Sequence, residues 1–160
     1  MSVIAAMDSA ADLLRSMSGL FALALTVAAC TEQPKANPSD AEQVARGKQI
    51  YVTQCATCHG MTLEGQPNWR ERLPNGKLPA PPHDKSGHTW HHSDALLFDI
   101  VKNGIEGHAP PGYQSDMPAF GARLTDAEIW SVLAYIKSTW PEETRKWQAQ
   151  VSSEDARARR

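Results

Sequence analysis

A five-residue motif, Cys55-Ala56-Thr57-Cys58-His59, constrains the fold of this 160-residue chain more than any other feature. Cys-x-x-Cys-His is the spacing by which a polypeptide attaches a c-type haem covalently. Two thiols on one helical turn can each add to a vinyl group on the same edge of the porphyrin, while the adjacent imidazole reaches the iron. We therefore predict one haem, bound covalently by Cys55 and Cys58, with His59 as the first axial ligand of the iron.

The second axial ligand is found by elimination among the methionines. Haem iron has two axial positions, and His59 fills one of them. Beyond the N-terminal leader the chain contains only Met61 and Met117, and Met61 is tethered on the same side of the ring as His59. Met117 precedes Pro118, which restricts the backbone of Met117 and lowers the entropy cost of presenting its thioether. We predict Met117 as the sixth ligand. A histidine is the alternative, and the candidates are His83, His88, His91, His92 and His108.

The N-terminal residues 1–29 are typical of an export signal. Arg15 precedes an apolar run of about ten residues, which is too short to span a bilayer as a helix. The four residues that end at Cys30 resemble the lipobox of bacterial lipoproteins, in which the cysteine becomes lipid-modified. We therefore predict lipid attachment at Cys30, with residues 30–38 as a polar tether. A conventionally cleaved signal, which leaves a soluble periplasmic protein, is the alternative.

The first helical segment begins near residue 39 and runs into the haem motif. Ser39 and Glu42 form a capping-box pattern at its start. Tyr51 and Cys55 follow on one face at helical spacing. Gly47 in the middle costs about 1 kcal/mol relative to alanine, which indicates that another element approaches the backbone closely there.

Two further helices have clear start and stop signals. The second begins after Ser93, which is a good N-cap, and ends at Asn103, which a glycine follows. The third begins with a capping box formed by Thr125 and Glu128. It ends before Pro141, which a helix interior does not accept.

The remaining stretches lack a regular period. Residues 60–87 and 105–120 are rich in proline, and loops this long in a compact domain are usually functional or wrap a ligand. For the highly charged residues 142–160 we expect a short surface helix and a frayed end. The predicted fold class is all-α, with three main helices and long loops around one haem.

These features make the chain similar to the class I cytochromes c, and the resemblance covers residues 39–141. It is carried by Gly47 and Tyr51, eight and four residues before Cys55, and by Met117 with its following proline. The resemblance implies that the first and last helices cross at Gly47, with Tyr51 against Val132 and Tyr135.

The same resemblance implies contacts around the haem. In this family a proline carbonyl soon after the motif accepts a hydrogen bond from the proximal imidazole, and Pro67 is the candidate here. An indole N–H can bind a haem propionate. The candidates for this donor are Trp69 and Trp90.

With both axial positions filled by protein, the iron has no open site for a substrate, so we expect one-electron transfer and no catalysis. Histidine and methionine ligation raises the reduction potential. The formal net charge of -2 excludes the strong basic field that nucleic-acid binding needs. The expected partners are redox proteins such as a membrane-bound dehydrogenase or terminal oxidase. We expect a monomer on the periplasmic face of a bacterial membrane, held by the lipid at Cys30.

Three alternatives use the same residues differently. Four histidines within ten residues suit copper or zinc, which would make the chain a metal-binding accessory protein; these are His83, His88, His91 and His92. A solvated loop is the preferred interpretation, because the ligand spacing is not that of a known site. A dithiol redox pair at Cys55 and Cys58 requires a strand-helix-strand pattern that the sequence lacks. Dissociation of Met117 would open the iron to peroxide or a small gas.

Overall fold

The computed structural model describes residues 35–160, so the predicted export signal, Cys30 and the first part of the tether lie outside the described residues. Between residues 35 and 160 the chain forms five α-helices and two short 3-10 helices, without a strand. The predicted all-α class is therefore confirmed. Across this part of the chain, every helix is too short or too polar to cross a membrane.

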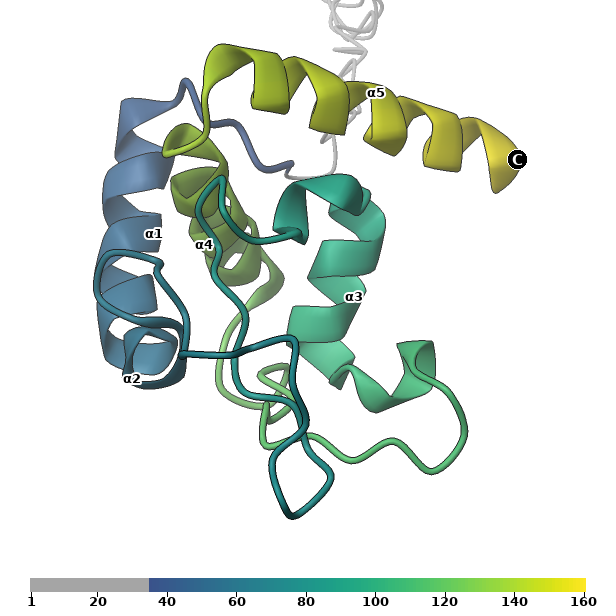
Figure 1. Cartoon of the computed structure of the whole chain (residues 1–160). Helices are drawn as coiled ribbons and strands as arrows, with labels where there is room; N and C mark the ends of the chain where they lie inside the picture. The colour runs from purple at the N-terminus through teal and green to yellow at the C-terminus, as the bar shows by residue number, and fades with distance from the viewer. Residues whose placement is uncertain (1–34) are drawn as a thin grey trace, which may run out of the picture. The chain divides into compact units, whose positions relative to one another are not determined.

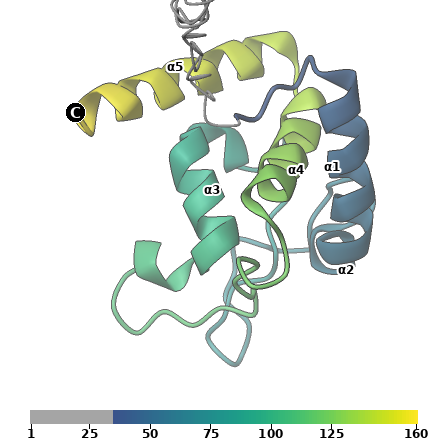
Figure 2. The ribbon, with the colours of Figure 1, turned by 180° about the vertical axis from the view of Figure 1, so that it is seen from behind.

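The core is the crossing of α1 (Ala41–Gln54) and α4 (Asp126–Ser138), which pack side by side in Figures 1 and 2. A Cβ atom placed on Gly47 would lie 1.9 Å from the backbone oxygen of Ser131, so only glycine fits at this point. Nearby, the rings of Tyr51 and Tyr135 pack with centroids 5.4 Å apart. The close approach predicted from Gly47 is therefore present, and it brings two buried tyrosines together.

The start of α1 differs from the prediction by one residue. The N-cap is Asp40, whose carboxylate accepts hydrogen bonds from the backbone N–H groups of Glu42 and Gln43, each at 3.0 Å. Ser39 lies outside the helix, and its N–H donates to the side chain of Asn37. Both residue types cap helices well, so the sequence pattern could not decide between them. The predicted caps of α3 (Asp94–Asn103) and α4 are confirmed, including the complete capping box of α4.

The described end of the predicted tether belongs to the folded domain. The Gln43 side chain holds it at two points, since its Nε2 donates to the carbonyl of Lys35 and its Oε1 accepts from the N–H of Asn37. Ala36 is only 6% exposed and packs into a core cluster that includes Leu97. The prediction of a tether through residue 38 is therefore wrong for residues 35–38, because a single small apolar side chain gave no signal of burial.

The C-terminal segment forms one long helix, α5 (Glu142–Ala158), which lies across the N-terminal end of α3 (Figure 1). Its Gln148 is completely buried, and the amide nitrogen donates to the carbonyl of His92 and to the carboxylate of Asp94. The ammonium of Lys137 also donates to Asp94, with bonds of 2.7 Å. The predicted short helix with a frayed end is wrong. This helix packs through polar groups, which an apolar pattern does not reveal.

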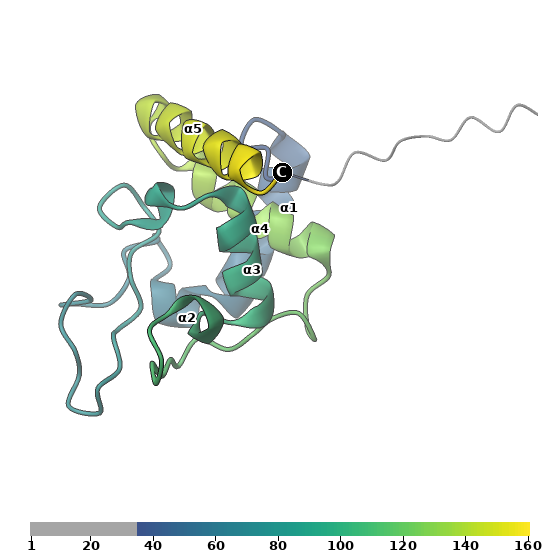
Figure 3. The same cartoon turned by 90° about the vertical axis from the view of Figure 1, so that its right-hand side faces the viewer.

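Two long loops complete the domain, and both lie away from α5 in Figure 3. The first leaves the domain at Gln66 and returns at Ala80, where the N–H of Gln66 donates to the carbonyl of Ala80 at 2.9 Å. The returning chain then leads through η1 (Thr89–His91) into α3. The second loop follows α3, includes η2 (Glu106–His108) and carries Met117 towards α4.

Candidate functional site

The haem motif forms its own short helix, α2 (Ala56–His59), directly after α1. Cys55 is half-buried and Cys58 is exposed, and the two thiols are not joined in a disulfide. The Tyr51 hydroxyl donates to the carbonyls of Gly60, at 3.0 Å, and of His59, at 3.3 Å. The core of the α1–α4 crossing therefore fixes the backbone at the end of the motif.

His59 is 7% exposed, and its ring is oriented by a backbone carbonyl. The Nδ1 atom lies 2.9 Å from the oxygen of Pro81, and a carbonyl can only accept, so Nδ1 carries the proton. The Nε2 atom then keeps its lone pair, which is the form that binds a metal. Burial lowers the pKa of His59, and the hydrogen bond to Pro81 opposes this shift only in part. The imidazole is therefore neutral at pH 7 and presents Nε2 as a donor atom.

The carbonyl hydrogen-bonded to the His59 imidazole belongs to Pro81, so the candidate Pro67 is wrong. Pro67 is exposed and stands at the start of the first long loop, whereas Pro81 follows the point where that loop returns. Gly65 permits the return, because a Cβ atom there would lie 2.4 Å from the nitrogen of Pro82. Sequence spacing alone could not show that the loop closes between Gln66 and Ala80.

His83 packs directly on His59. Its ring lies parallel to that of His59, with centroids 4.0 Å apart and an interplanar angle of 24°. Its Nδ1 is hydrogen-bonded to the hydroxyl of buried Thr89 at 2.8 Å. His83 is therefore on the same side as His59 and does not suit the opposite axial position. Neither the stacking nor the role of Thr89 had a signal in the sequence.

The other histidines are dispersed among separate contacts. His88 stacks on Trp69, His91 stacks on Trp90, and His108 pairs with Asp99. Among residues 35–160 no three His, Cys, Asp or Glu side chains lie close enough together to hold a metal ion. The alternative of a copper or zinc site in the His83–His92 loop has no support here.

Trp90 offers an unused hydrogen-bond donor. Its indole Nε1 is buried and has no hydrogen-bond partner within the described part of the chain. A buried N–H without a partner is costly, so a polar group that the protein itself does not supply is expected beside it. A haem propionate has the required acceptor oxygens. Trp69 instead stacks with His88 and has the guanidinium of Arg70 over its ring, so Trp90 fits the predicted role better.

Met117 is half-buried on the second long loop. Its N–H donates to the Ser115 hydroxyl at 3.0 Å, and the following Phe120 is buried, with its N–H on the carbonyl of Val101. On the other side, Asp116 forms an ion pair with Lys77 of the first loop. The segment that carries Met117 is therefore attached both to α3 and to the loop between residues 66 and 80.

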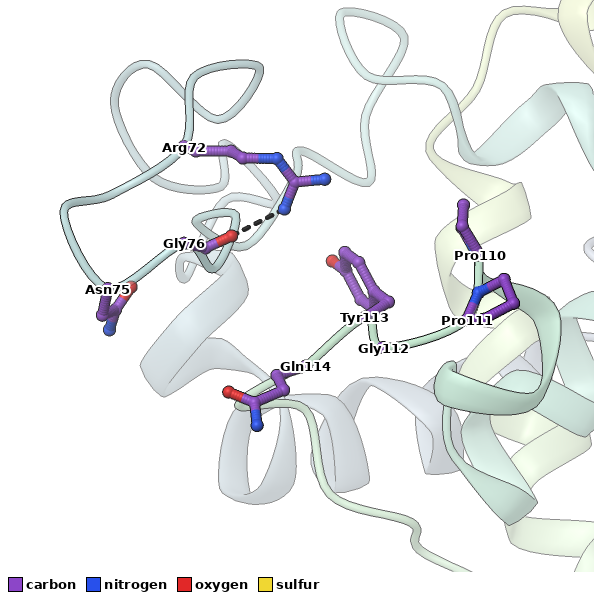
Figure 4. Close-up of a pocket in the computed structure, with 8 residues that line it drawn as sticks. All are labelled: Arg72, Asn75, Gly76, Pro110, Pro111, Gly112, Tyr113 and Gln114. Carbon is purple, nitrogen blue, oxygen red and sulfur yellow. Dashed lines mark hydrogen bonds between the residues drawn. The ribbon is translucent and has the colours of Figure 1, made fainter.

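A pocket of about 240 Å³ lies between these two loops (Figure 4). The first loop contributes Arg72, whose guanidinium donates to the carbonyl of Gly76 at 2.6 Å. The second contributes a turn that includes Tyr113, and Arg72 lies 5.8 Å from the centre of its ring. The two loops thus meet through polar and cation–π contacts close to Met117 in the chain.

The cysteines do not have the properties of a redox dithiol. Burial, with a further contribution from the charge of Cys58, raises the pKa of Cys55 to about 11. Reactive Cys-x-x-Cys pairs depend on a lowered thiol pKa. Residues 35–160 also lack the strands that such folds require. The thiols, the free Nε2 and the unpaired indole instead fit a covalently bound haem.

Comparisons with known proteins agree with this geometry. The family model described as cytochrome c matches residues 44–140. Cytochrome c6 of Picosynechococcus sp. is 33% identical over 139 residues, which covers 82% of this chain and 100% of that protein. Cytochrome c-555 of Prosthecochloris aestuarii is 30% identical over 108 residues, covering 61% of this chain and 91% of that protein.

Other relatives are larger proteins. The Cbb3-type cytochrome c oxidase subunit CcoP of Azospirillum sp. (strain B510) is 35% identical over 100 residues, which is 61% of this chain and 29% of that subunit. The chain likewise spans 29% of a thiosulfate dehydrogenase of Stutzerimonas stutzeri. No solved structure matches the chain. Because the family model covers more than half of the sequence and includes the whole haem motif, the chain belongs to the cytochrome c family.

Proposed function

We propose that this cytochrome c is a one-electron carrier, and not an enzyme, with its haem iron held between His59 and Met117. The observation that carries the proposal is the ring of His59, which follows the two free thiols and holds its Nδ1 proton on the carbonyl of Pro81. The family transfers electrons through covalently bound haem c. The bound haem supplies reversible one-electron exchange at its iron.

The residues around the motif keep the site in one geometry. Tyr51 holds the backbone after the thiols, and Pro81 keeps the Nε2 lone pair of His59 directed at the metal position. A thioether from Met117 stabilises the reduced metal relative to harder ligands and raises the potential. His59 and Met117 would together hold the iron, and oxygen or a substrate would then have to displace one of these side chains to bind.

The sixth ligand is tested by the absorption spectrum of the oxidised protein. We expect the weak sulfur-to-iron band near the red end of the visible range in the wild type, and its loss in Met117→Ala with the haem still attached. Met61→Ala is the matched control, because Met61 is 59% exposed and follows the motif on the proximal side. Persistence of the band in Met117→Ala would show that another residue is the ligand.

The proposed partners are redox proteins, such as a membrane-bound dehydrogenase or a terminal oxidase. Support comes from relatives named as an oxidase subunit and as a thiosulfate dehydrogenase. Electron carriers meet their partners through small, transient contacts, and we propose that this one does so as a monomer. The near-neutral net charge of -2 provides no ring of lysines that would identify the partner. Stopped-flow mixing with a purified oxidase would test this, since a carrier is oxidised on contact and shows no turnover of a substrate by itself.

We further propose export by the signal at residues 1–29 and lipid attachment at Cys30, so that the protein remains on the periplasmic face of a membrane. Two or more acyl chains suffice for stable anchoring. With residues 35–38 packed on the domain, the segment between Cys30 and the fold is short. Fractionation of cells tests the anchor: wild type is expected with the membranes and Cys30→Ser in the soluble fraction. Recovery of the wild type in the soluble periplasm would favour the conventionally cleaved signal.

A further inference from the structure

His83 is held in place from several directions. The backbone N–H of His83 donates to the carbonyl of Leu63 at 2.8 Å, and the backbone carbonyl of His83 accepts from the indole N–H of Trp140 at 2.7 Å. Trp140 is 1% exposed and lies just beyond the C-cap of α4, so this attachment reaches the core. The ring itself is hydrogen-bonded to Thr89 and meets the edge of Tyr51 at a centroid distance of 6.3 Å and an angle of 73°.

The hydrogen bond between His59 and Pro81 leaves one rotation of the His59 ring unrestricted. It decides which nitrogen of His59 faces the metal, but carbonyl oxygens accept over a broad range of directions, so the ring can still turn about its nitrogen–metal axis. A second flat ring, parallel and 4.0 Å away, blocks that rotation because turning would bring the two rings into collision. An aliphatic side chain of similar volume presents no flat face and restricts the rotation less.

We propose that His83 is a positioning residue, which fixes the plane of the proximal His59 imidazole by face-to-face stacking, and that Thr89 holds the His83 ring in register. This inference rests on the proposed ligation of haem iron by His59. Its basis is the stacked geometry, the hydroxyl partner of His83 and the two backbone attachments described above.

The orientation of an axial imidazole has its own spectroscopic signature. In ferric low-spin haem the unpaired spin density follows the plane of the imidazole. The order and spread of the four haem-methyl resonances in a paramagnetic proton spectrum therefore report that plane. This readout is separate from haem attachment, from folding and from electron-transfer activity.

The test compares three variants of the haem-loaded protein with the wild type. His83→Leu is expected to change the order or spread of the haem-methyl shifts. His83→Phe retains a flat ring but loses the bond to Thr89, so its pattern is expected to move no further than that of Thr89→Val, and less than that of His83→Leu. Thr89→Val removes the hydroxyl with little change in volume and is expected to shift the pattern in the direction of His83→Leu by a smaller amount. His108→Leu is the matched control, because His108 is exposed and pairs with Asp99 instead of stacking on His59.

Two results would overturn the inference. Wild-type methyl shifts in His83→Leu would show that the stacked ring does not set the plane. Equal changes in His83→Phe and His83→Leu would show that a flat ring alone does not restore it. If His83→Leu fails to fold, Thr89→Val decides, since wild-type shifts there would contradict the role of the hydroxyl. Absence of covalent haem from the wild type would instead refute the proposed function.

Discussion

Substitution of Gly47 by alanine tests the helix crossing that supports the haem motif. The new Cβ atom would lie 1.9 Å from the backbone oxygen of Ser131 and 3.0 Å from the Cβ of Tyr135. Real Cβ atoms essentially never lie within 3.0 Å of a non-bonded heavy atom, so α1 and α4 would have to separate by about 1 Å. The obstacle is backbone, which cannot swing aside as the end of a side chain can.

Two effects of opposite sign set the magnitude. Overpacking of a core typically costs about 1–3 kcal/mol. Replacing glycine by alanine inside a helix returns about 1 kcal/mol. Because a backbone oxygen is the obstacle, we expect the overpacking cost at the top of its range or above. The net loss in the free energy of unfolding is then about 2 kcal/mol.

Guanidinium unfolding of the haem-loaded protein, followed by tryptophan fluorescence, measures this loss. Ala45→Gly is the control, because Ala45 is exposed on the same helix and reports the helix-propensity effect alone. A Gly47→Ala protein as stable as the wild type, or more stable, would refute the reasoning. It would mean that the two helices can separate without cost.

Three further predictions concern other parts of the domain. Gln148→Ala should lower the free energy of unfolding, measured with a chemical denaturant, by about 1–3 kcal/mol, because it removes the buried donor that attaches α5. Gln150 is exposed on the same helix, so Gln150→Ala should cost almost nothing. Equal costs for the two variants would contradict this account of α5. Lys77→Met should lower the free energy that keeps Met117 bound to the iron by only about 0.2–1 kcal/mol, because the ion pair with Asp116 is exposed. Loss of the sulfur-to-iron absorption band on heating measures this free energy. The difference from wild type should vanish in about 1 M salt, and a larger effect that salt does not change would argue against a surface ion pair. Burial, with a neighbouring histidine, lowers the pKa of His92. The unfolded chain therefore takes up this proton first, and stability falls as the pH drops below about 6.5. Urea unfolding of His92→Gln should show a weaker fall between pH 7 and pH 5, and an unchanged slope would count against the shift.

The sequence was sufficient to predict the parts of the fold that depend on local chemistry. Ser93 and the capping box at Thr125 mark helix starts through hydrogen bonds within one turn, and the structure has both. Gly47 predicted a close approach, because a glycine in a helix is costly unless space requires it. The spacing of Cys55, Cys58 and His59 predicted the haem, since the chemistry itself fixes that spacing.

Features that depend on long-range closure could not be predicted. Pro81 reaches His59 only because a loop of unknown path returns at Ala80, and sequence distance says nothing about that return. The same holds for His83, which the sequence does not distinguish from the other loop histidines and which only the folded chain places on the ring of His59. The length of α5 and its attachment to the domain were not predicted, for another reason. Its attachment through Gln148 is polar, whereas helix prediction relies on apolar periodicity.

The central claim is the covalent haem at Cys55 and Cys58, and the mass of the denatured protein tests it most directly. The protein should be produced with a competent cytochrome c maturation system and extracted with acidified organic solvent before mass spectrometry. We predict that the colour stays with the polypeptide and that its mass equals that of the processed chain plus one haem. A colourless chain at the mass of the polypeptide alone, with the pigment in the solvent, would contradict the account.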